Sequence, residues 1–295
     1  KFSRNPFYRS KLMWRIARIN AVRAISPAFS RTPMVADAIA RVSGATERIG
    51  YVGDSNNASE VWKRVSDGWF TCLIENPNSE SEVVRNTHFA MAFGQQVLVE
   101  SLPRLQIDWS QYIRVVPEGS YAVICPGAGW IGRQWPIERF TEISNWLAEK
   151  YNIYIVVCGS SDDVEAAEYM SQHSRASIVN MTGRTSLVDL ACLVRGACLL
   201  IGNESSAVHI AASVNVPAVC ITGGGHFGRF VPYPVSSRLH EAVPSIVVAK
   251  MPCFGCNWRC IYVQKDGRSV SAVPCIERIS VEDVKLAIQE SYKES

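Results

Sequence analysis

The sequence predicts an α/β protein whose second half is a doubly wound domain with a parallel sheet. From Pro117 onward, short apolar runs alternate with segments of helical periodicity, which is the rhythm of parallel βαβ units. The apolar runs are continuous rather than alternating, as strands buried on both faces require. A chain of 295 residues is long enough for two domains. We place these at residues 1–116 and 117–279, followed by a C-terminal helix at 280–295 that could pack back on the first domain.

Composition limits the classes of function. A net charge of +3 is too small to argue for nucleic acid as a partner. No apolar run approaches the roughly 18 residues of a membrane span, and no signal-peptide core follows the first residues. Ten cysteines are too sparse for a disulfide scaffold, and several end apolar runs, where Cys behaves as a small hydrophobe. We therefore expect a soluble, cytoplasmic protein.

The first part of the chain begins with a basic segment. Residues 1–31 contain eight Lys or Arg and no Asp or Glu, and their apolar residues recur at near-helical spacing. Two interpretations remain open: a helix with one buried face and a solvated basic face, or a surface for an anionic acceptor or an anionic membrane. Further helices are expected at 37–44 and 82–94, and strands at 48–52 and 70–74. Strands and helices do not alternate cleanly here, so this part resembles a portion of a domain.

The second half is easier to divide into elements. Strands are expected at 121–125, 153–158, 177–180, 198–201 and 218–222, and helices at 136–150, 163–173, 186–194 and 281–291, with a further helix beginning near Ser206. Pro136 suits a first helical position, and Ser280 is a suitable N-cap.

Several polar loops are expected to meet at one edge of this sheet. The turn 202–206 follows a strand and opens a helix, which Ser205 or Ser206 can cap. The remaining free N–H groups and the helix dipole favour an anion there. Loops at 127–135, 159–163 and 183–186 end at the same edge, and the glycine-rich loop 223–229 should join them, since glycines allow positive φ or close backbone approach.

The loop after the first of these strands contains the pattern G-x-G-x-x-G, at Gly127, Gly129 and Gly132. In a dinucleotide site the glycines open the helix directly, and an acid follows about 20 residues later. Here three residues and Pro136 intervene, and the acids Asp162 and Asp163 lie later than that. A loop that brings backbone close to a ligand, with Arg133 supplying charge to a phosphate, fits better.

Taken together, these motifs resemble the heptosyltransferase family (glycosyltransferase family 9). The resemblance rests on Pro126–Gly–Ala–Gly–Trp with Arg133–Gln–Trp–Pro, on Gly183–Arg–Thr–Ser–Leu, on Gly202–Asn–Glu–Ser–Ser–Ala–Val–His, and on the cysteines around Cys253 and Cys275. Gly44–Ala–Thr–Glu–Arg–Ile–Gly–Tyr51 is similar to the family's amino-terminal domain. The match runs from Ala38 to about Val284 and is strongest beyond Tyr121.

The resemblance implies a GT-B fold of two Rossmann-like domains, the amino-terminal one incomplete in this chain. It implies an inverting, metal-independent glycosyltransferase, without cofactor, that moves heptose from ADP-heptose to the lipopolysaccharide core. The partners would be a nucleotide-sugar donor and an anionic glycolipid acceptor, with no nucleic acid. The enzyme would work in the cytoplasm, with peripheral contact at the cytoplasmic face of the inner membrane.

The resemblance also assigns the donor site. Arg133 stands where the family usually has a phosphate-binding Lys, Glu204 where it has Asp, and Ser206–Ala207 where it has Gly–Pro. Asp163, or Glu165 if the alignment slips by two residues, falls near the ribose-binding acid, and Thr185 near the nucleoside contact. His209 would donate to a phosphate, or else cap the turn or pack against a loop. The predicted donor-binding residues are Gly127, Arg133, Asp163, Thr185, Ser186, Glu204, Ser205, Ser206, Ala207 and His209.

No catalytic base can be named from this chain. The family carries an acid in a Gly–Asp loop after its first strand, and nothing before Ala38 resembles that loop. We expect either a fragment of an enzyme or a protein that binds nucleotide sugars without catalysis. A dinucleotide-dependent oxidoreductase is the remaining alternative.

Cys253, Cys256, Cys260 and Cys275 form a separate cluster in the sequence. Four thiolates can close a tetrahedral zinc site, but Cys260 and Cys275 do not form a C-x-x-C pair. The resemblance implies no general metal requirement, so we expect no metal. Buried free thiols and a disulfide are the alternatives.

Overall fold

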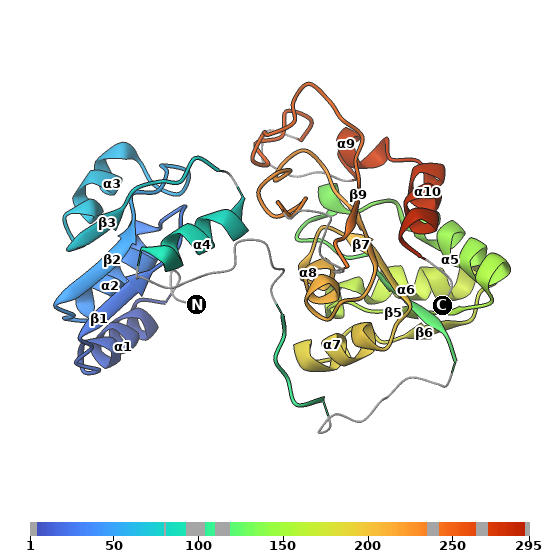
Figure 1. Ribbon diagram of the computed structural model, residues 1–295, viewed down its shortest axis with the longest axis horizontal. Coiled ribbons are helices and arrows are strands. Elements are labelled where there is room, and N and C mark those ends of the chain that lie inside the picture. Colours follow the sequence, from blue (N-terminus) through green and yellow to red (C-terminus); the bar gives the residue numbers. More distant parts are fainter. Residues whose placement is uncertain are drawn as a thin grey trace. The chain divides into compact units, whose positions relative to one another are not determined.

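The computed structural model describes residues 5–79, 81–92, 104–109, 119–234, 242–263 and 271–292. The chain divides into two compact units, residues 1–99 and residues 100–295. Figure 1 shows the elements of each unit. The division falls before residue 116, where the sequence suggested a boundary, and residues 93–103 and 110–118 lie outside the described part.

The first unit is built on a three-stranded parallel sheet. Its strands are β1 (Arg23–Ser26), β2 (Glu47–Tyr51) and β3 (Cys72–Ile74), in that order across the sheet. Its helices are α1 (Pro6–Ala17), the π-helical turn η1 (Pro33–Asp37), α2 (Ala38–Val42), α3 (Glu60–Asp67) and α4 (Glu82–Met91). Strands and helices therefore alternate, and the prediction that they do not was wrong. β1 and α3 were not predicted.

Helix α1 begins where Asn5 accepts a hydrogen bond from the Tyr8 N–H, with Pro6 at the first helical position. None of its residues is buried, and the side chains of Phe7 and Trp14 are largely exposed. Three apolar residues on one face are half-buried, and α1 contacts α2. The predicted helix is therefore confirmed, but the face expected to be buried is only half-buried.

The core of the first unit is small. Phe29, Ile49, Tyr51 and Phe89 form its buried cluster, and the Tyr51 ring meets the Phe89 ring edge-on at 4.9 Å. A parallel sheet needs cover on its faces, and here helix α4 provides part of it through Phe89.

The second unit is the predicted doubly wound domain. Its parallel strands lie in the order β6-β5-β4-β7-β8-β9. Their bounds are β4 (Tyr121–Cys125), β5 (Tyr154–Val157), β6 (Ile178–Asn180), β7 (Leu199–Asn203), β8 (Ala218–Ile221) and β9 (Ser245–Val247). Every strand predicted in this half is confirmed, and β9 was missed. The strand order reverses between β4 and β7, which is the switch point where ligands bind in open parallel sheets.

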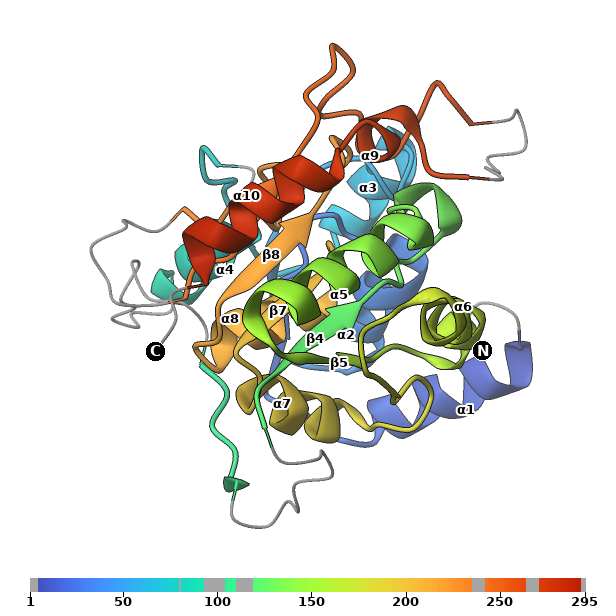
Figure 2. The same ribbon diagram turned by 90° about the vertical axis from the view of Figure 1, so that its right-hand side faces the viewer.

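Helices cover both faces of this sheet. They are α5 (Ile137–Tyr151), α6 (Val164–His173), α7 (Leu187–Arg195), α8 (Ser206–Ser213), α9 (Pro274–Glu277) and α10 (Val281–Ser291). Apolar side chains of α5, α6 and α10 share one core cluster, and those of α7 and α8 share the other. Figure 2 shows α5 and α10 in front of the strands. Helix α10 contacts β8, β9 and α5, so it packs within the second unit.

Candidate functional site

The loops that follow β4 and β7 meet at the switch point. The register pairs Cys125 with Gly202, so the two strands end side by side. Asn203, fully buried, then joins the loops: its Nδ2 donates to the Pro126 carbonyl at 2.5 Å, and its Oδ1 accepts from the Trp135 N–H at 3.1 Å. We did not predict this role. A polar residue at the end of an apolar strand was the signal that could have revealed it.

Arg133 and Glu204 form an ion pair across these two loops. Arg133 Nη2 donates to both the Oε2 and the carbonyl oxygen of Glu204, each at 3.0 Å. Burial raises the pKa of the Glu204 carboxyl, while the charge of Arg133 opposes that rise. Both hydrogen bonds that the guanidinium donates to described residues come from Nη2, which leaves Nη1 and Nε for another acceptor.

The amino terminus of α8 lies next to this pair. Ser205 is its N-cap and Ser206 its first residue, but Ser205 makes no side-chain cap hydrogen bond. The prediction that a serine side chain closes this end was wrong. Helices α7 and α10, by contrast, are closed by capping boxes. Because Ser205 does not accept a cap hydrogen bond through its side chain, the backbone N–H groups in the first turn of α8 are not taken up by the cap. Ala207, in this turn, is buried.

Gly127 and Asp163 are brought together, as predicted for two donor-site residues. A side chain at Gly127 would place its Cβ 2.2 Å from an oxygen of Asp163, and at Gly159 the gap would be 2.5 Å. The same carboxylate accepts from the N–H and hydroxyl of Ser160, at 2.7 and 2.9 Å, as part of a capping box. The hydrogen-bond partners of the Asp163 carboxylate therefore come from its own loop. Glu165, the alternative acid, is exposed in the first turn of α6.

The remaining nucleoside-side residues lie at the start of α7. Ser186 is the N-cap, and its hydroxyl donates to Asp189 at 2.7 Å within a capping box. The Ser186 side chain therefore caps helix α7. Thr185, the preceding residue, is half-buried.

His209 lies in the first turn of α8 and contacts the loop after β8. Its Nδ1 is 2.5 Å from the hydroxyl of Tyr233, and the two rings meet edge-on. Burial lowers the pKa of His209, which favours the neutral imidazole. Of the three roles left open, contact with a loop is the one that Nδ1 fulfils, through the Tyr233 hydroxyl.

The glycine-rich loop after β8 serves packing. Within this loop Gly228 has a positive φ of +89°, but Gly223, Gly224 and Gly225 do not. A Cβ at Gly224 would lie 2.5 Å from the Phe254 ring, and one at Gly225 would lie 2.3 Å from the Trp258 ring. These glycines make room for the segment 251–263, which we call the cysteine loop. Close approach was predicted correctly, but the approaching group belongs to the protein.

The four clustered cysteines border one small cavity of about 20 Å³, together with Trp258 and neighbouring side chains. All ten cysteines are free thiols. Among the described residues, which include these four, no group of three or more His, Cys, Asp or Glu side chains could hold a metal ion. Of these four, Cys275 is buried and the other three are half-buried.

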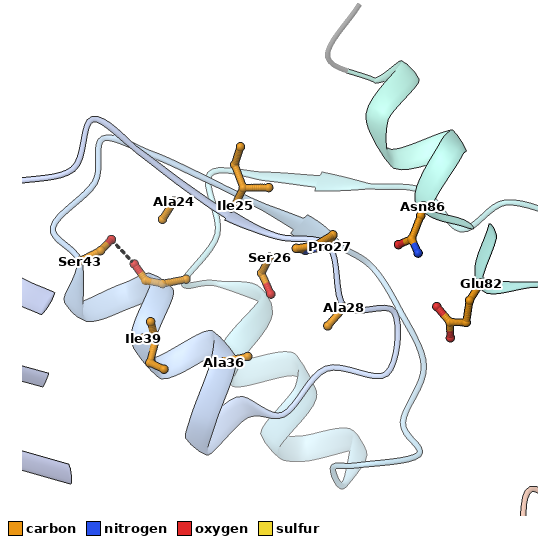
Figure 3. A pocket seen from close by; sticks show the side chains of 11 residues that line it. Ala24, Ile25, Ser26, Pro27, Ala28, Ala36, Ile39, Ser43, Glu82 and Asn86 are labelled. Carbon is orange, nitrogen blue, oxygen red and sulfur yellow. Dashed lines mark hydrogen bonds between the residues drawn. The ribbon is translucent and has the colours of Figure 1, made fainter. Parts of the chain in front are cut away.

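A larger cavity of about 620 Å³ lies in the first unit, beside the edge strand β1. Figure 3 shows Glu82 and Asn86 of α4 at one end of its lining and Ile39 and Ser43 at the other, with Pro27 and Ala28 between them. Glu82 is the one ionisable side chain among the described residues that line it, and its carboxyl lies 3.5 Å from the Arg85 guanidinium in an ion pair. This geometry does not identify a catalytic base.

The strand order of the second unit, with polar loops at the switch point and a further parallel α/β unit before it, defines a protein of the Rossmann-type α/β class. Residues 34–255 match the model of glycosyltransferase family 9 (heptosyltransferase). The chain belongs to that family.

Known proteins agree with this assignment. Lipopolysaccharide heptosyltransferase 3 of Escherichia coli K12 is 30% identical over 105 residues, which is 35% of this chain and 30% of that protein. The match thus spans about a third of the relative. E. coli ADP-heptose lps heptosyltransferase II superposes with a TM-score of 0.66 at 16% identity, over 96% of this chain and 80% of that one. E. coli heptosyltransferase WaaC with ADP-2-deoxy-2-fluoro heptose gives 0.61 at 16%, over 95% and 77%. These likenesses establish the GT-B fold.

The described residues contain no helix that is long and apolar enough to span a membrane.

Proposed function

We propose that this chain binds a nucleoside-diphosphate sugar, ADP-heptose, at the loops after β4 and β7. We further propose that it takes part in an inverting, metal-independent transfer of heptose to a lipopolysaccharide core acceptor. The observation that supports this most is the Arg133–Glu204 pair beside the α8 terminus. A guanidinium with free donors next to unpaired backbone N–H groups suits a diphosphate.

The site would act mainly by stabilising charge. As the bond between sugar and diphosphate breaks, negative charge grows on the leaving diphosphate. Arg133 Nη1 and Nε, with the N–H groups of Ser206 and Ala207, would stabilise that charge from fixed positions. Glu204 would hold the guanidinium in place through its two hydrogen bonds. The Asp163 region and Thr185 would bind the nucleoside.

An acidic residue must deprotonate the acceptor hydroxyl, and we assign it to no residue of this chain. The acceptor would be an anionic glycolipid. Helix α1 carries Arg9, Lys11 and Arg15 and has no acidic residue in its first turn, so we propose that it faces this acceptor and the cytoplasmic face of the inner membrane.

Calorimetry with ADP tests the donor site. We expect Arg133→Ala to weaken ADP binding roughly 10- to 150-fold, because a charge-assisted hydrogen bond contributes roughly 1.5–3 kcal/mol. Arg175→Ala is the matched control, since Arg175 is 79% exposed and pairs only at the surface with Glu149. Equal ADP affinity in wild type and Arg133→Ala would remove Arg133 from the site.

Two further measurements separate the alternatives. A thermal shift with NADH but none with ADP or UDP would favour a dinucleotide-dependent oxidoreductase. ADP binding without transfer of heptose, measured on the full-length protein with ADP-heptose and a lipopolysaccharide core acceptor, would favour a non-catalytic nucleotide-sugar-binding protein.

A further inference from the structure

Trp258 of the cysteine loop stands over the Arg133 guanidinium. The guanidinium carbon lies 5.0 Å from the centroid of the indole ring, within the range of a cation–π interaction. Glu204 holds Nη2 of the same guanidinium through two hydrogen bonds. Arg133 is thus fixed by a carboxylate from the β7 loop and by an aromatic face from the cysteine loop.

Several residues contact the Trp258 indole, and we call the position that they form its seat. Trp130 meets Trp258 edge-on at 5.8 Å, and the ring of His226 lies 6.0 Å away at a similar angle. Gly225 lies against the indole, where any Cβ would be 2.3 Å from ring atoms. Three residues from two loops of the second unit, those after β4 and β8, therefore surround this one side chain.

The backbone at this seat is strained. Asn257 and Trp258 have φ angles of +48° and +56°, in the left-handed region that residues other than glycine seldom adopt. For a bulky residue this conformation costs free energy, and such strain persists where surrounding contacts enforce it, often at functional sites. In addition, the Nε1 of Trp258 is buried and has no hydrogen-bond partner among the described residues. A tryptophan placed at this cost suggests a role beyond filling space.

We propose that Trp258 is a positioning residue for donor binding: its indole face orients the Arg133 guanidinium so that Nη1 and Nε point toward the diphosphate. The proposal rests on the proposed function, because it assigns Arg133 to the diphosphate. It also assigns a role to the cysteine loop, which places this indole at the donor site.

The first test is calorimetry with ADP on the whole chain. We expect Trp258→Leu, which keeps an apolar but smaller side chain and removes the aromatic face, to weaken ADP binding roughly 3- to 30-fold. Trp258→Phe keeps a weaker aromatic face and should lose less. Trp146→Leu is the matched control: Trp146 also carries a cation over its ring, Lys150 at 5.1 Å, but it lies on α5. Its ADP affinity should equal that of wild type.

A double-mutant cycle distinguishes positioning from a general structural effect. If Trp258 acts through Arg133, then Trp258→Leu should cause no further loss in an Arg133→Ala background. An equal loss in both backgrounds would overturn the proposal, as would unchanged affinity of Trp258→Leu in the wild-type background. Thermal midpoints of all variants show whether the fold is kept, and Trp258→Phe provides the comparison if Trp258→Leu does not fold.

A ligand-free measurement separates this proposal from the proposed function. The Nε–H signal of Arg133 in an NMR spectrum should carry a ring-current shift from the indole, which Trp258→Leu removes and Trp146→Leu leaves. If wild type does not bind ADP, the proposed function fails, and this shift still reports whether Trp258 holds Arg133. An Arg133 signal that is the same in wild type and Trp258→Leu would overturn the proposal by itself.

Discussion

At the scale of single residues, His209 shows how burial decides between two roles. A protonated imidazole at the helix terminus could have paired with a phosphate by charge. Burial instead lowers its pKa, and Tyr233 occupies its Nδ1. The ring can still donate one hydrogen bond from Nε2, provided that the tautomer places the proton there. Its contribution to a phosphate would then be a neutral hydrogen bond.

We predict that the pKa of His209, measured by NMR titration, lies below the ordinary value of about 6.5. Since the folded ring binds its proton less tightly than the unfolded chain does, the free energy of unfolding should fall as the pH drops from 6.5 toward the folded pKa. His209→Gln should reduce this dependence by up to about 1.4 kcal/mol per pH unit. A pKa of 6.5 or above would contradict the burial seen here.

The sequence identified which residues gather at the site better than what each one binds. Arg133, Glu204 and the start of α8 were predicted to lie together, and they do. Sequence motifs could not show that Arg133 forms an ion pair with Glu204, because that contact joins two loops that lie 71 residues apart in the sequence. The contacts of Trp258 escaped notice for the same reason, whereas Asn203 carried a local signal, a polar residue at the end of an apolar strand, that was not used.

At the scale of elements, a buried ion pair links several elements of the first unit. Arg31 follows β1, and its Nη1 lies 3.3 Å from the Oδ2 of Asp37 at the end of η1; both side chains are buried. Arg31 also bonds to Asp67 at the end of α3. Burial raises the pKa of Asp37, and Arg31 opposes that rise. This cluster ties β1, η1 and α3 together.

We predict that Asp37→Asn destabilises the first unit by about 3–5 kcal/mol, because it leaves the Arg31 charge buried with one partner fewer. The double variant Arg31→Met with Asp37→Leu should lose less, since it removes both buried charges and leaves Asp67, which is partly exposed, paired with Lys63. Glu149→Ala, which breaks an exposed pair, should change the free energy of unfolding by less than about 1 kcal/mol. Chemical denaturation followed by circular dichroism measures all three. A double variant less stable than Asp37→Asn would contradict this account.

The difference in burial between the strands of the two units explains which elements the sequence predicted. In the second unit the strands are continuous apolar runs, and all five predicted strands were found within two residues of their expected ends. Helix α10 was predicted to the residue. In the first unit, β1 has four residues and is half-exposed, so its apolar signal is weak. Its parallel pairing with β2 creates that strand, and such tertiary pairing is not visible in local sequence.

At the scale of the whole molecule, the two units have cores of very different size. The first unit has a cluster of four buried apolar side chains around Tyr51. The second has clusters on both faces of a six-stranded sheet. Because burial of apolar surface is the main favourable term in folding, the second unit should be the more stable.

We predict two transitions in scanning calorimetry of the whole chain, with the first unit unfolding at the lower temperature. ADP at 100 times its dissociation constant should stabilise the second unit by about 2.7 kcal/mol and raise the upper transition, because the proposed donor residues all lie in that unit. Asp37→Asn should lower the other transition and leave the ADP-sensitive one in place. Arg133→Ala should reduce the ADP shift without moving the lower transition. If ADP raised the lower transition instead, the donor site would have to include residues of the first unit, and the assignment of donor binding to the loops after β4 and β7 would be incomplete.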